Sequence, residues 1–149
     1  KVLSRQARER LHAEIQRVAR AVAVGHAQPQ EIDRLGIARA TALAMRRAIE
    51  GLGLPVDHVL VDGRELDLGV PSTAIVRGDA TVRAIAAAAV YAKVARDALM
   101  AELDVAYPGY GLAENKGYGS AGHLSAIAAL GPSPIHRRSF SPCSQLGLF

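Results

Sequence analysis

Apolar residues recur at helical spacing in the first part of the chain. Ser4 stands where an N-cap belongs, and Leu11 and Ile15 repeat at helical spacing among charged residues. The pattern predicts an amphipathic helix over residues 4–20. The run AVAVGHA that follows, residues 21–27, has no helical periodicity and predicts a strand.

A second helical region is predicted over residues 28–51. Pro29 suits a helix start, Gly51 suits a helix end, and the apolar positions between them share one face. Gly36 is the point at which this region could break.

Two short β-branched runs come next, HVLVDG at residues 58–63 and STAIVRGD at residues 72–79. Each run is closed by Gly and Asp, and only a short connection separates them. Two adjacent strands are expected here.

The remainder reads as helix and loop. Residues 80–107 contain neither Gly nor Pro and are rich in alanine, which predicts one long helix. A glycine-rich loop precedes a final helix at residues 121–131, with Gly131 as its C-cap, and residues 132–140 are punctuated by proline. Strands alternating with helices indicate an α/β sheet with helices on its faces.

Composition narrows the class of protein. The 149 residues suit one domain, and 50% apolar with 21% charged residues is typical of a globular chain. The longest apolar run, residues 84–92, is too short to cross a bilayer, so we expect no membrane association. A single cysteine, Cys143, cannot form an internal disulfide, which fits a cytoplasmic location.

Positive charge is concentrated near the C-terminus. The whole chain has a formal net charge of +4, and residues 115–149 contain Lys116, Arg137 and Arg138 but no Asp or Glu. Such a segment suits a polyanion such as nucleic acid. A solvated, partly flexible C-terminus is an equally good interpretation of this feature alone.

Asp62 and Asp79 are the candidate metal ligands. Each lies at the carboxyl end of a predicted strand, where ligands gather in open α/β sheets. Two converging carboxylates repel unless a cation lies between them, and Mg²⁺ or Mn²⁺ prefers such oxygen ligands. Asp beside Gly is also ordinary turn chemistry, and the spacing alone does not decide between these alternatives.

Lys116 and Tyr118 in the loop KGYG place a cation next to an aromatic hydroxyl, which suits contact with a nucleic-acid backbone or sugar. A surface turn with an ordinary tyrosine is the alternative. The histidines lack metal-ligand spacing, and no glycine-rich phosphate loop follows a strand.

Several motifs together resemble one family. VDG, VRGD, YPGYG, NKGYGSAGH and GPSPIHRRSF follow in the order and spacing of ribonuclease HII, the bacterial type 2 ribonuclease H. The opening KVLS is similar to the end of that family's D-S-K-x-L-S segment, which would make Lys1 its lysine. The likeness covers about residues 1–140 and implies a ribonuclease H-like mixed sheet flanked by helices, with residues 141–149 as a C-terminal tail.

The resemblance also implies an activity. Members cut the RNA strand of RNA–DNA hybrids and nick beside single ribonucleotides in duplex DNA, using two Mn²⁺ or Mg²⁺ ions held by four carboxylates and leaving 5′-phosphate ends. Asp62 and Asp79 match two of those carboxylates, and Tyr118 matches the tyrosine that packs on the sugar at the DNA–RNA junction. Lys116 and Lys1 are further substrate-binding candidates. We expect a monomer that acts in replication and repair.

The chain departs from the family pattern at its start. The family's opening D-E-x-G-R-G motif carries the other two carboxylates, and neither Asp-Glu nor Gly-Arg-Gly occurs here. We therefore expect an N-terminally truncated chain that lacks the first strands of the sheet. The alternative function is a non-catalytic, nucleic-acid-binding fragment of the same enzyme.

Overall fold

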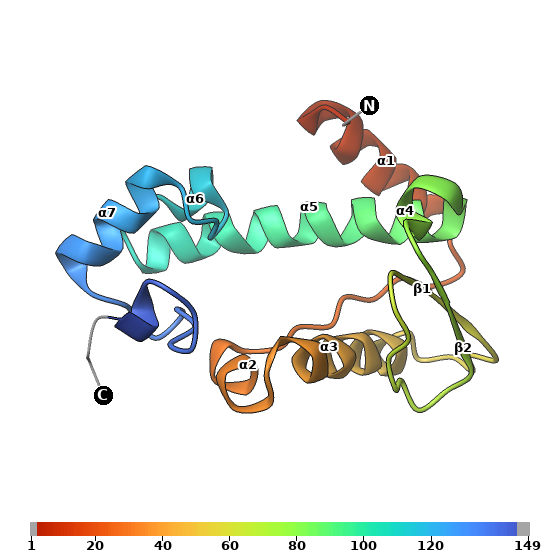
Figure 1. The fold of residues 1–149 in the computed structure, drawn as a ribbon. Coiled ribbons are helices and arrows are strands. Elements are labelled where there is room, and N and C mark those ends of the chain that lie inside the picture. Colours follow the sequence, from red (N-terminus) through yellow and green to blue (C-terminus); the bar gives the residue numbers. More distant parts are fainter. Residues whose placement is uncertain (1–2, 146–149) are drawn as a thin grey trace. The chain divides into compact units, whose positions relative to one another are not determined.

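The structure is a computed structural model, and it describes residues 3–145. Figure 1 shows the helices and strands in their chain order. The chain divides into two compact units. The first comprises residues up to 26 together with Ala38–Ala95, and the second comprises Ala27–Ile37 together with residues from 96 onward.

Helix α1, Arg5–Val18, begins the first unit. The Ser4 side chain accepts a hydrogen bond from the Ala7 amide at 3.2 Å, which confirms the predicted N-cap and helix. The ring of His12 stacks on Tyr91 with centroids 4.2 Å apart. No residue of α1 is buried, so the helix is largely exposed.

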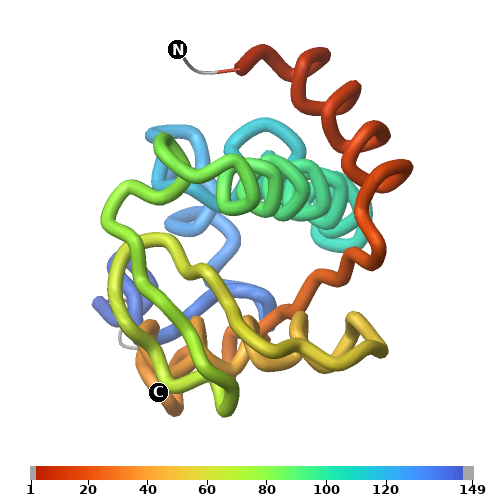
Figure 2. The backbone as a smooth tube through the Cα atoms, turned by 90° about the vertical axis from the view of Figure 1, so that its right-hand side faces the viewer, coloured from red at the N-terminus to blue at the C-terminus, as the bar shows by residue number. Residues whose placement is uncertain are grey.

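The strand predicted over residues 21–27 is wrong. Residues 21–28 have no regular secondary structure, and Figure 2 shows them as an extended trace without helical turns. The segment contacts helix α3, Ile37–Gly51, where Arg47 donates to the His26 carbonyl oxygen at 2.7 Å. A helix with its own hydrogen bonds satisfied cannot pair with this backbone as a strand would.

The predicted break at Gly36 is confirmed. Helix α2, Pro29–Leu35, ends at Gly36, whose φ of 75° favours a residue without a side chain. Pro29 is the first residue of α2, as its fixed φ and missing N–H allow. Helix α3 then begins at Ile37 and ends at Gly51.

The predicted pair of adjacent strands is also confirmed. Strand β1, Val59–Asp62, pairs in parallel with β2, Ser72–Ile75, and Asp62 is opposite Ile75. Parallel strands need a connection that returns to the start of the first strand. Residues 63–71 make this return without a helix.

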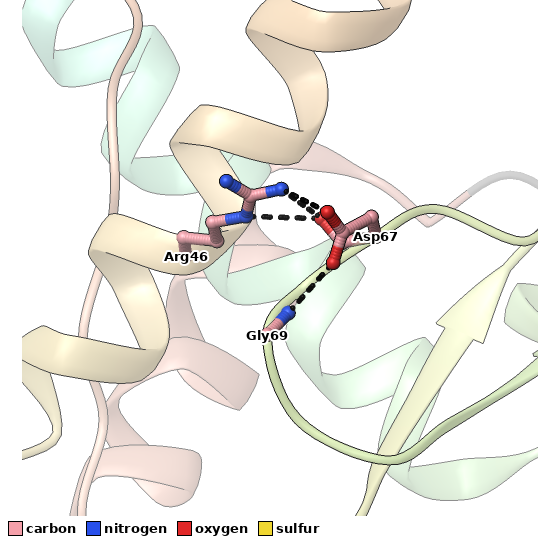
Figure 3. Close-up of polar contacts among 3 residues, drawn as sticks. All are labelled: Arg46, Asp67 and Gly69. Atoms are coloured by element: carbon pink, nitrogen blue, oxygen red, sulfur yellow. Dashed lines mark hydrogen bonds and ion pairs between the residues drawn. The ribbon is translucent and has the colours of Figure 1, made fainter.

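The core of the first unit joins this sheet to α3. Ala42 of α3, Val61 of β1 and Leu68 of the connection are buried together. Arg46 holds the same connection from the side, donating to the Asp67 carbonyl oxygen at 2.7 Å and to its carboxylate at 2.9 Å (Figure 3). Apolar burial and this exposed ion pair together fix the sheet on the helix.

The single helix predicted over residues 80–107 is interrupted near its start, which corrects that prediction. Helix α4, Gly78–Thr81, is followed by Val82 in an extended conformation, and α5 spans Arg83–Ala106. The break buries Ile85, which is 6% exposed and lies against Gly78. Burial of an apolar side chain thus overrides the helical propensity of the alanine-rich sequence.

The second unit contains α6, Leu112–Asn115, α7, Ala121–Leu130, and a short 3₁₀ helix, Cys143–Gln145. Its buried core consists of Tyr110, Leu112, Ile127 and Cys143. The predicted final helix is confirmed, including its cap: Gly131 has φ 76° and donates its N–H to the Ile127 carbonyl oxygen at 2.9 Å.

The proline-punctuated segment is tied to α2. The carboxylate of Asp33 accepts hydrogen bonds from the amides of Arg138 and Ser139, at 2.8 and 3.0 Å. Cys143, within the expected tail of residues 141–149, is 6% exposed. The division into residues 1–140 and a tail stays a prediction. No helix within residues 3–145 has both the length and the apolar character of a membrane span.

Candidate functional site

Asp62 is the last residue of β1, and its exposed side chain lies at the carboxyl end of the strand. Its Oδ1 accepts a hydrogen bond from the Gly78 amide at 2.7 Å. Pairing with β2 places the end of β1 beside the chain that leaves β2, since Gly63 also donates to the Ile75 carbonyl oxygen at 2.9 Å. Asp62 and Gly78 are separated in the sequence, and the parallel pairing of β1 with β2 brings them together.

Asp79 does not lie at the end of a strand, which corrects the sequence prediction. Strand β2 ends at Ile75, and Asp79 is the second residue of α4. Its side chain is exposed. The hydrogen bond from Gly78 brings the Asp62 carboxylate to the residue adjacent to Asp79. Convergence of the two carboxylates stays a prediction that this contact supports.

The donor set at this edge suits a hard divalent cation. Carboxylate oxygens are the ligands that Mg²⁺ and Mn²⁺ prefer, usually with water in the remaining positions. Within residues 3–145, no group of three or more His, Cys, Asp or Glu side chains could hold a metal ion. The carboxylate oxygens of Asp62 and Asp79 are of the chemical type that such a cation takes, and their role as a ligand pair stays a prediction.

The loop with Lys116 and Tyr118 belongs to the second unit. Lys116 has a left-handed backbone with φ 54°, which is uncommon without glycine. Arg96 holds it there by donating to the Lys116 carbonyl oxygen at 3.1 Å. Tyr118 is 62% exposed.

Asn115 organises this loop, and the sequence analysis missed it. Its side-chain amide donates to the Tyr110 carbonyl oxygen at 2.7 Å, and its Oδ1 accepts from the Gly117 amide at 2.8 Å. The sequence signal for this role is an Asn two residues before a Gly, because Asn often bonds the backbone two positions on. Gly78 was also missed, and no local pattern would have pointed to its contact with Asp62.

Two histidines lie beside the core of the second unit. His123 is 5% exposed and its Nδ1 is 3.0 Å from the Tyr110 carbonyl oxygen. His136 stacks on it with centroids 5.5 Å apart, and its Nδ1 accepts from the Ser133 amide at 3.1 Å. Burial, then the proximity of His123, lowers the pKa of His136.

Nucleophilic thiol chemistry is disfavoured. Burial raises the pKa of the Cys143 thiol, which favours the protonated, unreactive form. Lys1, the remaining substrate-binding candidate from the sequence, lies outside the described residues.

Comparison with known proteins identifies the family. The family model of ribonuclease HII matches residues 1–143. The chain belongs to the ribonuclease HII family. It is 51% identical to a ribonuclease HII of Desulfitobacterium hafniense over 146 residues and 52% identical to that of Laribacter hongkongensis over 153 residues. The resemblance inferred from the motifs is therefore confirmed.

A solved structure confirms the ribonuclease H-like fold. The crystal structure of ribonuclease H2 from Pyrococcus horikoshii matches with a TM-score of 0.76, covering 96% of this chain and 76% of that one. The sequence identity is 22%, so the likeness concerns the fold.

The ribonuclease HII relatives are longer than this chain. The match covers 97% of this chain but 56% of the Desulfitobacterium hafniense protein, and 99% but 51% of that from Myxococcus xanthus. The Laribacter hongkongensis protein is covered over 77% of its length. The chain thus spans about half the length of the first two of these relatives.

Proposed function

We propose that this chain supplies part of the active site of an endoribonuclease that hydrolyses the RNA strand of RNA–DNA hybrids and nicks at ribonucleotides in duplex DNA. The observation that carries the proposal is the hydrogen bond from the Gly78 amide to Asp62, which brings one candidate carboxylate to the residue next to the other, Asp79. Family membership supports the reaction class.

Asp62 and Asp79 would act as metal ligands. Both side chains are exposed, so a phosphate of the substrate can approach them. A pair of Mn²⁺ or Mg²⁺ ions at such carboxylates supplies an activated water and neutralises the charge that develops on the scissile phosphate. The family pattern implies four carboxylates, and the remaining two would come from a D-E-x-G-R-G segment that these 149 residues do not contain.

Lys116 and Tyr118 would bind the nucleic acid. An exposed tyrosine ring can pack on a sugar or base, and a lysine beside it can contact a phosphate. The acid-free stretch of residues 115–149 supports the same role, because no carboxylate there repels the polyanion. We further propose that the protein acts as a monomer in the cytoplasm, where one unpaired cysteine is tolerated.

The test adds a segment carrying the D-E-x-G-R-G motif upstream of Lys1 and measures cleavage of duplex DNA with one ribonucleotide. Manganese-dependent nicking that leaves a 5′-phosphate is expected. Asp62→Asn and Asp79→Asn should each reduce the rate of nicking by more than about 100-fold. That factor is the largest effect usual for residues that support a metal ligand without binding the metal, so a direct ligand should exceed it. Asp57→Asn is the matched control, since this exposed residue precedes β1 at its other end. Nicking that persists in both ligand variants would contradict the proposal.

A further inference from the structure

The turn between β2 and α4 has an unusual backbone. Arg77 adopts a left-handed conformation with φ 56° and ψ 37°, which is costly for a residue with a side chain. Its carbonyl oxygen accepts the amide of Ala80 at 3.0 Å and the hydroxyl of Thr81 at 3.2 Å. These bonds stabilise the turn, and the turn leaves the next amide, that of Gly78, directed at Asp62.

The Gly78 amide is a rigid donor to the Asp62 carboxylate. The distance of 2.7 Å between the Gly78 nitrogen and Asp62 Oδ1 is short for a bond from a backbone amide, as expected when the acceptor is charged. A backbone donor held between a strand and a helix cannot rotate as a side chain does. The direction of the Asp62 carboxylate is therefore set by the position of the Gly78 peptide.

Gly78 is buried, and a side chain there would collide with one atom, the terminal methyl carbon of Ile85. A Cβ built on it would lie 2.6 Å from Cδ1 of Ile85, 3.4 Å from Cβ of Ile75 and 3.5 Å from Oδ1 of Asp62. Only the first of these is closer than atoms can approach. Because Ile85 is 6% exposed, a methyl group at position 78 would displace either the Ile85 side chain or the turn itself.

We propose that Gly78 is a positioning residue for the candidate metal site, and that packing against Ile85 fixes the position of Gly78. The Gly78 peptide fixes Asp62 by its N–H and carries Asp79 as the next residue, so one backbone unit determines how the two carboxylates are presented. The inference rests on the proposed function in taking these carboxylates as metal ligands.

The first measurement needs no metal. Hydrogen exchange of the Gly78 amide is followed by NMR in the unaltered chain and in Asp62→Ala. If the Asp62 carboxylate accepts this N–H, removing the carboxylate should speed hydrogen exchange of the Gly78 amide by at least about 10-fold. This factor corresponds to the loss of one hydrogen bond to a charged group. The amide of Val82, which donates to the Gly78 carbonyl oxygen, serves as the internal control. Equal exchange of Gly78 in both proteins would overturn the proposal.

The second measurement follows Mn²⁺ binding through broadening of the amide signals near Asp62 and Asp79. Gly78→Ala should weaken Mn²⁺ binding by about 10- to 100-fold, as loss of support to a ligand usually does. Ile85→Val removes the Cδ1 that the new methyl would meet. The double variant Gly78→Ala with Ile85→Val should therefore recover most of the affinity. Gly122→Ala is the control, since nothing lies within 4 Å of a Cβ there.

The outcomes separate the inference from the proposed function. A folded Gly78→Ala with unchanged Mn²⁺ affinity, or a double variant with no recovery, overturns the positioning role. If Gly78→Ala fails to fold by circular dichroism, the double variant and the exchange measurement decide. If Asp62→Asn and Asp79→Asn bind Mn²⁺ as the unaltered chain does, the proposed function fails, and Gly78 exchange still reports whether its N–H holds Asp62.

Discussion

The carboxylate edge and the Lys116–Tyr118 loop are held in place in different ways. At the edge, Asp62 is oriented by a residue that the parallel pairing of two strands brings to it. In the loop, Asn115 bonds Gly117 and Tyr110, which are near it in sequence, and one longer-range bond runs from Arg96 to the Lys116 carbonyl oxygen. The edge therefore depends on the packing of a whole unit, whereas the loop depends on local turns seated on a buried core.

The largest expected effect comes from the core beneath the loop. Ile127→Ala should lower the free energy of unfolding by about 2–5 kcal/mol, because Ile127 is 3% exposed and its loss leaves a cavity. Urea denaturation gives this value. Leu130→Ala, at a side chain 57% exposed in the same helix, should change it by less than about 0.5 kcal/mol. An equal loss in the free energy of unfolding for Ile127→Ala and Leu130→Ala would show that the loop is not supported by this core.

The packing of the extended segment on α3 in the first unit is tested at Gly25. A Cβ there would lie 1.9 Å from the Ala44 carbonyl oxygen and 2.6 Å from the Ala48 amide, so Gly25→Ala must displace the backbone of α3. The expected loss of stability is about 1–3 kcal/mol or more. Thermal melting measures it, with Gly122→Ala as control, since nothing lies within 4 Å of a Cβ at this position and the change should not destabilise the protein. A neutral Gly25→Ala would refute close packing of this segment on α3.

The attachment of the C-terminal segment is tested at Asp33. Burial alone would raise the pKa of Asp33, but hydrogen bonds from Ser139 and Arg138 and the charge of Arg137 outweigh it and lower the pKa. The stabilisation that ionised Asp33 gives the folded chain is then complete above the pKa of Asp33 in the unfolded chain, about 3.9. It is lost as pH falls below that value. Asp33→Ala should cost about 1–3 kcal/mol at pH 7, and its cost should shrink in acid. A pH-independent difference between the two proteins would contradict this assignment.

The smallest effect concerns His136. Its lowered pKa means that the unfolded chain binds the proton more readily, so stability is complete above about pH 6.5 and is lost as pH falls toward the folded pKa. Protonation would add a hydrogen to Nδ1, which could then no longer accept the Ser133 amide, and the buried Nε2 has no partner among residues 3–145. His136→Asn should flatten the decline in melting temperature between pH 7.5 and 5. If the melting temperature of His136→Asn declined as that of the unaltered chain does, other titrating groups would be responsible for the decline.

Local patterns in the sequence were sufficient for much of the fold. Ser4, Gly36 and Gly131 marked helix ends because their side chains, or the lack of one, satisfy or release backbone groups at those points. Residues 21–27 were misread because apolar composition does not tell a strand from an extended segment packed on a helix. The break at Val82 was missed because burial of Ile85, a tertiary effect, decides it.

The sequence supplied candidate residues for the site, but it did not contain their geometry. Asp62 and Asp79 could be selected because carboxylates after β-branched runs suit a cation. The role of Gly78 depends on strand register and on the distance to Ile85, neither of which local sequence contains. Asn115 was recognisable in principle from its spacing to Gly117.

Binding of Mn²⁺ to the isolated chain tests the central claim most directly. Titration followed by paramagnetic broadening of amide signals should show the strongest loss around Asp62 and Asp79 in the unaltered chain. Asp62→Asn and Asp79→Asn should each remove that effect, and Asp57→Asn should leave it intact. Broadening that is centred elsewhere, or that survives both substitutions, would contradict a metal site at this edge of the sheet.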